Sequence, residues 1–133
     1  MKYNGIISRK LESISQRIEK LRLLGPLSLD SLEKDYFLRS GIERTLQVCI
    51  EAMIDIAERI ISLENLPPAT TSTKALEQLE SLGAIADARV YSDMVKFRNF
   101  IVHRYETIDT SILLAVCNNK LDDFDRFINE ISN

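Results

Sequence analysis

The stretch GIERTLQVCIEAMIDIAERII, residues 41–61, decides the fold. Its apolar side chains recur at intervals of four and three residues, which is the spacing of one face of an α-helix. The members of this stripe are Leu46, Ile50, Met53, Ala57 and Ile60. Because an apolar stripe must be covered by another element, the stretch predicts a long amphipathic helix packed against neighbouring helices.

Two further segments carry the same spacing. One precedes Gly25 and Pro26, and its stripe consists of Ile7, Leu11, Ile14, Ile18 and Leu21. The other lies near the end of the chain and consists of Cys117, Leu121, Phe124, Ile128 and Ile131. No segment shows the sustained alternation of apolar and polar residues that is typical of a strand. The pattern therefore predicts an all-α protein.

Helix breakers and cap residues give the expected boundaries. Asp30, with Glu33 three residues later, has the form of a capping box that opens a helical stretch to about residue 65. Ser40 and Gly41 mark a point where that stretch could bend or be interrupted. Ser72 is the expected N-cap of a shorter helix that stops at Gly83.

Two more helices are expected over about residues 86–103 and 109–131, the latter opened by the cap residues at 109–111. With the first helix, this makes an antiparallel bundle of about five helices. At 133 residues, the chain has the usual length of one domain, so we expect residues 1–133 to fold as a single domain.

Composition narrows the class of function. Hydrophobic residues make up 45% of the chain and charged ones 28%, as in ordinary globular proteins. The formal net charge of -3 argues against a protein that coats long nucleic acid, although it permits a small phosphate site. No apolar run approaches the ~20 residues of a membrane span, and no signal peptide is apparent. We therefore expect a cytoplasmic protein without a membrane segment.

The metal-ligating residue types are sparse. Cys49 and Cys117 lie far apart, and the chain has one histidine, His103. This spacing does not form a metal-binding set, so we interpret both cysteines as reduced thiols packed as small apolar groups. We expect neither a metal nor another cofactor.

The histidine lies in RNFIVHRY, residues 98–105. A helical projection places Arg98 on the apolar side, within an arc formed by Met94, Phe97, Ile101, Val102 and Tyr105. A guanidinium on that side is costly unless it is paired or borders a cleft or an interface. An ion pair with Glu51 or Asp55 is one explanation, and a functional site is the other.

Polar residues form a second group on this helix. Lys96, Asn99 and His103 share another side, and Arg98 and His103 point about 140° apart on a straight helix. The two side chains therefore do not converge easily on one small group. Either the chain turns near His103, or two copies of the helix meet and each supplies part of a site, as in a symmetric dimer.

The spacing Arg-x4-His-x-Tyr, with Asn directly after the Arg, resembles the motif of the HEPN superfamily and in particular of its HepT-like toxins. Residues 41–61 are similar to the second helix of that family, and YETIDTSILLAVCNNKLDDFDRFINEI, residues 105–131, is similar to its final segment. The resemblance covers about residues 5–131. Arg98, Asn99, His103 and Tyr105 each occupy a matching position.

The resemblance implies a dimeric α-helical bundle that acts as a toxin and as a metal-independent endoribonuclease. Arg98 and His103 would be its catalytic residues, and Asn99 and Tyr105 would support them. The implied partners are a second copy of the chain, an RNA substrate, either tRNA or mRNA, and an antitoxin nucleotidyltransferase of the MntA type. This antitoxin would block the toxin by transferring AMP onto Tyr105.

Two other interpretations remain open at this point. The chain could be a non-catalytic HEPN module in which Arg98 and His103 hold a nucleotide or dock the nucleotidyltransferase. It could also be a purely structural helical dimer in which the motif forms an interface network.

Overall fold

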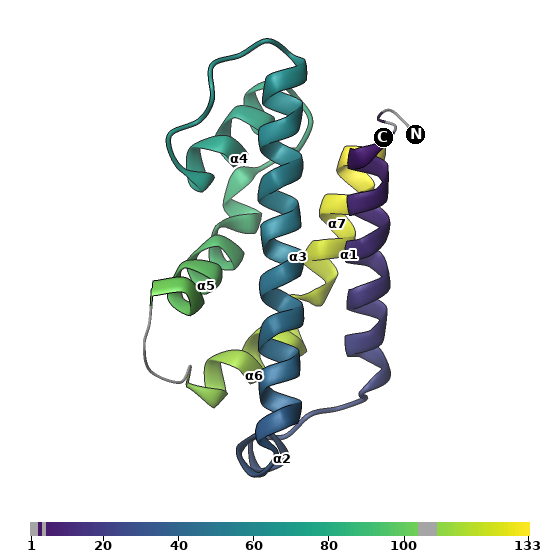
Figure 1. Cartoon of the computed structure of the whole chain (residues 1–133), viewed down its shortest axis with the longest axis vertical. Coiled ribbons are helices and arrows are strands. Elements are labelled where there is room, and N and C mark those ends of the chain that lie inside the picture. Colours follow the sequence, from purple (N-terminus) through teal and green to yellow (C-terminus); the bar gives the residue numbers. More distant parts are fainter. Residues whose placement is uncertain (1–2, 4, 104–108) are drawn as a thin grey trace.

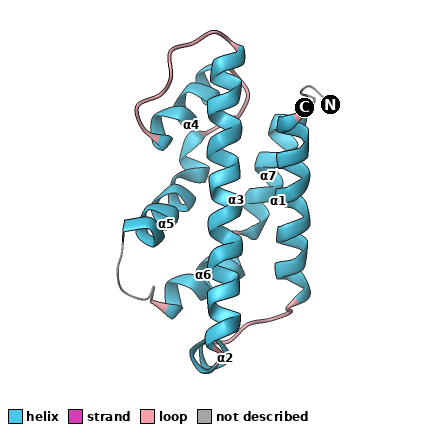
Figure 2. Cartoon of the chain, viewed as in Figure 1, coloured by secondary structure: helices cyan, strands magenta, loops and turns pink. Residues whose placement is uncertain are grey.

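The computed structural model describes residue 3 and residues 5–103 and 109–133, and of Val102 and His103 it describes the backbone alone. Within this part of the chain, all regular structure is helical (Figure 2), which confirms the all-α prediction. The α-helices are α1 (Ile6–Leu23), α2 (Leu29–Lys34), α3 (Tyr36–Leu63), α4 (Ser72–Ser81), α5 (Ser92–His103), α6 (Thr110–Asn119) and α7 (Leu121–Ser132), with a 3-10 helix, η1 (Ala88–Tyr91), before α5.

The long helix α3 is the axis of the bundle (Figure 1). Helices α1 and α7 lie together on one side of it, α4 and α5 lie on the other, and α2 and α6 close the end at which α3 begins. The stripe predicted for α3 is buried in full: Leu46, Ile50, Met53, Ala57 and Ile60. Burial of each large apolar side chain stabilises the fold by about 1.5–3 kcal/mol, so this stripe contributes strongly to holding α3 in the bundle.

The described part contains seven α-helices where about five were expected, and the first additional break falls at Asp35. Its carboxylate accepts a hydrogen bond from the backbone N–H of Leu38 and caps α3. A bend or an interruption was expected at Ser40 and Gly41, and the interruption does not occur, because α3 continues through both residues. The expected capping box of Asp30 and Glu33 is also wrong. The box that opens α2 is formed by Ser28 and Ser31, each of which accepts from the other's backbone N–H.

The second additional break falls at Lys120, between α6 and α7. As predicted, Asp109 caps this region by accepting a hydrogen bond from the backbone N–H of Ser111. Helix α6 packs against α2, whereas α7 packs against α1. A single straight helix would not follow both neighbours, and the bend at Lys120 lets the segment change direction between them.

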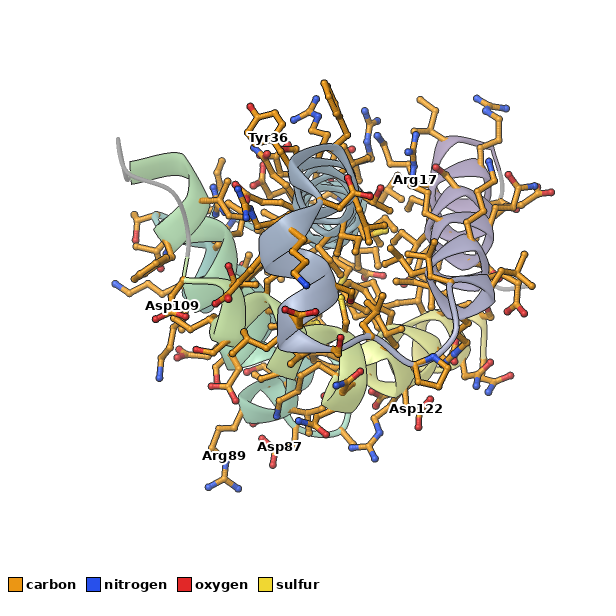
Figure 3. All side chains as sticks on the ribbon, turned by 90° about the horizontal axis from the view of Figure 1, so that it is seen from below. Arg17, Tyr36, Asp87, Arg89, Asp109 and Asp122 are labelled. Carbon is orange, nitrogen blue, oxygen red and sulfur yellow. The ribbon has the colours of Figure 1, made fainter. Side chains whose placement is uncertain are left out.

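The segment before α5 also differs from the prediction, because residues 86 and 87 precede a 3-10 turn rather than starting an α-helix. Asp87 accepts a hydrogen bond from the backbone N–H of Arg89 and pairs with its guanidinium. Figure 3 shows both side chains at the edge of the molecule, pointing outward. The motif helix α5 therefore begins only at Ser92.

Ion pairs reinforce the side of the bundle opposite α5. Arg22 of α1 binds Asp122 at 2.7 Å and Asp125 at 2.6 Å, which joins α1 to α7. Asp55 of α3 binds Lys10 of α1 at 3.1 Å and Arg59 at 2.7 Å. In the part of the chain described above, no helix is long and apolar enough to cross a bilayer.

Candidate functional site

The start of the motif helix is fixed by two carboxylates. The buried Tyr91 hydroxyl donates a hydrogen bond to Glu130 of α7, and the other oxygen of Glu130 accepts from the backbone N–H of Ala86 at 2.6 Å. Glu80 of α4 accepts from the backbone N–H of Ala88 at 2.7 Å. Burial raises the pKa of Tyr91, and its hydrogen bond to Glu130 raises it further, so the phenol stays a neutral donor. The chain therefore enters α5 from a segment held by both α4 and α7.

The two sides of α5 are arranged as its sequence predicts. Met94 and Phe97 are buried, whereas Lys96 and Asn99 are exposed. Val95 is buried in addition, because α5 contacts both α3 and α4 and is covered over a wider arc than one stripe. The helix therefore presents Asn99 to solvent and turns its apolar side toward the bundle.

Arg98 is half-buried, as expected for a guanidinium on the inward side of α5. Its Nη2 donates a hydrogen bond of 2.6 Å to the Oγ of Ser72, the first residue of α4. Its Nε is buried and has no hydrogen-bond partner in the described part of the chain. The guanidinium thus sits at the edge of the bundle, held by a hydroxyl from another helix.

The alternative in which Arg98 pairs with Glu51 or Asp55 is wrong. Asp55 is engaged by Lys10 and Arg59, and Glu51 accepts a hydrogen bond from Gln47 at 3.2 Å. Burial of Asp55 opposes its ionisation, but hydrogen bonds from Arg59 and Lys10 outweigh this and hold the pKa of that carboxyl below its usual range. Both carboxylates therefore have partners of their own on or beside α3.

Ser72 has a different role from the one predicted for it. Thr71 is the N-cap of α4, and its hydroxyl accepts a hydrogen bond from the backbone N–H of Lys74 at 3.1 Å. The hydroxyl of Ser72 is therefore available to Arg98. Four consecutive hydroxyl residues, 70–73, at the start of a helix are the signal in the sequence, since one of them suffices as the cap.

The remaining motif residues are only partly placed. His103 is the last residue of α5, and its side chain is not among those described. Tyr105 and Arg104 lie outside the described residues. The relation between Arg98, His103 and Tyr105 in space therefore stays a prediction from the sequence.

A hollow of about 340 Å³ runs along α5 and α6, next to the motif. Its floor is apolar and includes Phe97, Phe100 and Val116, and Lys96 and Lys120 stand at its rim. Among the described residues, no group of three or more His, Cys, Asp or Glu side chains is arranged to hold a metal ion. The described site offers a guanidinium, an amide and lysine ammonium groups, of which that of Lys120 pairs with the Asp93 carboxylate at 3.4 Å.

Comparison with known proteins identifies the family of this chain. The family model described as "Ribonuclease HepT-like" matches residues 14–131. A protein of Shewanella oneidensis named "mRNA nuclease HepT" is 30% identical over 131 residues, which are 96% of this chain and 97% of that protein. A protein of Aphanizomenon flos-aquae named "tRNA nuclease HepT" is 25% identical over 129 residues, which are 96% of this chain and 88% of that protein.

Solved structures match the chain over nearly its whole length. The tri-AMPylated Shewanella oneidensis HEPN toxin in complex with MNT antitoxin superimposes with a TM-score of 0.86 at 28% identity, covering 98% of both chains. A toxin-antitoxin structure with AMP-PNP gives the same TM-score, identity and coverage. Since both the family model and a relative at 30% identity span most of the chain, this protein belongs to the HepT-like ribonuclease family.

Proposed function

We propose that this protein is the toxin of a toxin-antitoxin pair and an endoribonuclease that acts in the cytoplasm through Arg98 and His103. The observation that carries the proposal is the half-buried Arg98 guanidinium on α5, in a chain that belongs to the HepT-like family. The relatives named as nucleases of mRNA and of tRNA support RNA as the substrate class.

RNA supplies its own nucleophile, which limits what the protein must contribute. The 2'-OH attacks the adjacent phosphorus, the 5'-oxygen leaves, and the products are a 2',3'-cyclic phosphate and a 5'-hydroxyl. Histidine titrates near neutral pH, so His103 is suited to take the proton from the 2'-OH or to give one to the 5'-oxygen. The planar fork of Arg98 is suited to the phosphate oxygens, on which negative charge grows in the transition state.

Two further residues support the same centre. Asn99 is exposed on α5 and carries an amide that would bond the ribose or orient the imidazole. Tyr105 would position a phosphate oxygen. These steps require no metal ion, so we propose a metal-independent reaction.

The site would be completed by a second copy of the chain. Arg98 and His103 point about 140° apart on a straight helix, so Arg98 of one subunit and His103 of its partner would share one phosphate. The apolar hollow along α5 and α6 lies beside the motif and would be covered when two copies of α5 meet.

Regulation would come from an MntA-type nucleotidyltransferase that adenylylates Tyr105. The solved complex of a tri-AMPylated HEPN toxin with MNT antitoxin, at a TM-score of 0.86, supports this assignment. An AMP group on Tyr105 would bring a negative phosphate into reach of Arg98 and would occupy the place of the RNA phosphate. Charge and bulk would then both exclude the substrate.

The test is cleavage of bulk tRNA and of an mRNA transcript by purified variants. Arg98→Ala and His103→Ala should fold like the wild type and lose cleavage by a factor of about 100 or more. Arg17→Ala is the matched control, because Arg17 is exposed on α1, away from α5 (Figure 3). If His103→Ala cleaves RNA as fast as the wild type, the enzyme assignment fails. Tight binding of ATP or of the nucleotidyltransferase without cleavage of either RNA would identify a non-catalytic module instead.

The shared site has its own test, in which Arg98→Ala and His103→Ala chains are unfolded together and refolded at equal concentration. Half of the resulting dimers would be mixed, and each mixed dimer would hold one intact site and one doubly altered site. The mixture should therefore regain about a quarter of wild-type activity. If both residues of a site came from one subunit, mixing would restore no activity.

A further inference from the structure

We propose that Ser72 is a positioning residue for the reaction, and that its hydroxyl holds the guanidinium of Arg98 in the orientation that stabilises the transition state. The inference rests on the proposed function, because it assigns Ser72 a role through Arg98. It concerns a residue of α4 that lies outside the Arg-x4-His-x-Tyr motif.

The contact between the two side chains is short and carries a charge. Nη2 of Arg98 lies 2.6 Å from Oγ of Ser72, and charge-assisted hydrogen bonds of this kind are among the stronger ones in proteins. Arginine has five N–H donors in a rigid fork, so fixing one corner orients the others. Nε is buried and has no partner in the described part, which leaves the Ser72 bond as the described polar restraint on this guanidinium.

The Ser72 hydroxyl is not needed to form α4. Thr71 caps the helix through its own hydroxyl, and alanine is at least as favourable as serine within a helix. Helix α4 is itself held in place by its buried side chains, Ala75, Leu76 and Leu79. Ser72 therefore presents its hydroxyl to Arg98 from a helix that other side chains hold in place.

We expect loss of the Ser72 hydroxyl to affect kcat more than KM. Without the hydroxyl, the long Arg98 side chain gains rotamers, and some of them no longer face the phosphate. Phosphate binding in the ground state depends on net charge, which does not change. Stabilisation of the developing charge depends on placement, and a small misplacement is enough to slow the chemical step. We expect Ser72→Ala to lower kcat about 5- to 20-fold and to change KM by less than about twofold.

The experiment measures kcat and KM for cleavage of bulk tRNA and of an mRNA transcript by five proteins: wild type, Ser72→Ala, Ser72→Thr, Ser81→Ala and Arg98→Ala. Ser72→Thr keeps the hydroxyl and should retain at least half of wild-type kcat. Ser81→Ala is the matched control, because Ser81 lies at the other end of α4 and its hydroxyl donates a hydrogen bond to the backbone oxygen of Glu77, at 3.2 Å. Its kcat should equal that of the wild type. Thermal unfolding of each variant should stay within about 3 °C of the wild type.

The outcomes separate a failure of the inference from a failure of the proposed function. A loss of kcat in Ser72→Ala that is restored in Ser72→Thr supports the inference. If Ser72→Ala is fully active while Arg98→Ala is inactive, the inference is overturned and the proposed function stands. If Ser72→Thr is as slow as Ser72→Ala, the hydroxyl is not what matters and the inference is likewise overturned. If Arg98→Ala cleaves like the wild type, the proposed role of Arg98 fails, and the inference fails with it.

Discussion

Tyr91 donates its hydroxyl hydrogen to Glu130, 39 residues further along the chain, and so joins the last residue before α5 to the final turn of α7. The other oxygen of Glu130 accepts the backbone N–H of Ala86. One carboxylate therefore satisfies a buried phenol and the backbone of the segment that leads into the motif helix. The stability of the site thus depends on a side chain far from it in sequence.

Replacement of this carboxylate should destabilise the protein. Glu130→Ala leaves the buried Tyr91 hydroxyl and the Ala86 N–H without their acceptor, and we expect the free energy of unfolding to fall by about 2–4 kcal/mol. Glu130→Gln keeps one acceptor oxygen and should lower it by about 1–2 kcal/mol. Urea unfolding measures both. Glu77→Ala, an exposed glutamate on α4, is the control and should change little. Equal stability of Glu130→Ala and wild type would show that the network contributes nothing.

The same phenol should limit stability at alkaline pH. Burial raises the pKa of Tyr91 in the folded state, and the hydrogen bond to Glu130 adds to this, whereas an unfolded tyrosine titrates near pH 10. The folded state therefore keeps a proton that the unfolded state releases. The contribution of Tyr91 is fully present below about pH 10 and is lost as the pH rises further. The free energy of unfolding, measured from pH 8 to 11, should fall less steeply in Tyr91→Phe than in the wild type. Tyr36→Phe, which removes an exposed hydroxyl, should leave the slope unchanged.

Both cysteines should be protected from alkylation while the protein is folded. Burial raises the pKa of the Cys49 thiol to about 12 and that of Cys117 to about 11. Because the thiolate is the reactive form, iodoacetamide at pH 8 should modify neither residue in native buffer and both in urea. Mass spectrometry counts the added groups. Rapid modification of the native protein would contradict the burial of both thiols.

Adenylylation can be tested by mass after co-expression with an MntA-type nucleotidyltransferase. The protein should gain one or more AMP units, and Tyr105→Phe should remove the modification. Tyr36→Phe is the control, because that tyrosine is exposed at the start of α3 and should not matter. Modified protein should cleave RNA far more slowly than unmodified protein. Persistence of every AMP unit in Tyr105→Phe would place the modification on another residue.

Removal of metal should not affect the reaction. The proposed steps use the 2'-OH of the RNA, His103 and Arg98, so cleavage in excess EDTA should proceed at the same rate as without it. The products should carry 2',3'-cyclic phosphate and 5'-hydroxyl ends. A rate that falls in EDTA and returns when Mg²⁺ is added would assign part of the chemistry to a metal ion.

Long periodic stretches were the predictable part of the fold. The stripe of α3 is buried as predicted, because many residues contribute to one pattern and a local error does not change its period. The breaks at Asp35 and Lys120 were missed. A cap depends on one or two polar side chains, and polar residues also occur throughout solvent-facing helix surfaces. Which of them acts as a cap is decided by packing, such as the burial of Leu32 that anchors α2 against the bundle.

The site, too, was predictable only as far as local helical geometry determines it. Helical geometry alone places Arg98 on the inward side of α5 and Asn99 on the outward side, and the structure agrees. The partner of Arg98 was not predictable, because Ser72 is 26 residues away and belongs to another helix. Contacts of this kind depend on how α4 and α5 pack, and no local pattern in the sequence encodes that arrangement.

The Thr71 hydroxyl caps α4, and the neighbouring Ser72 hydroxyl holds the guanidinium of Arg98. Both residues belong to an unbroken run of four hydroxyl residues, Thr70 to Thr73, so the junction has a spare hydroxyl on either side. Residues could be added or removed between α3 and Thr71 with little consequence, since loops tolerate changes of length. Deletion of a single residue at the junction would likewise leave one hydroxyl for the cap and one for the arginine, because Thr70 and Thr73 flank the pair.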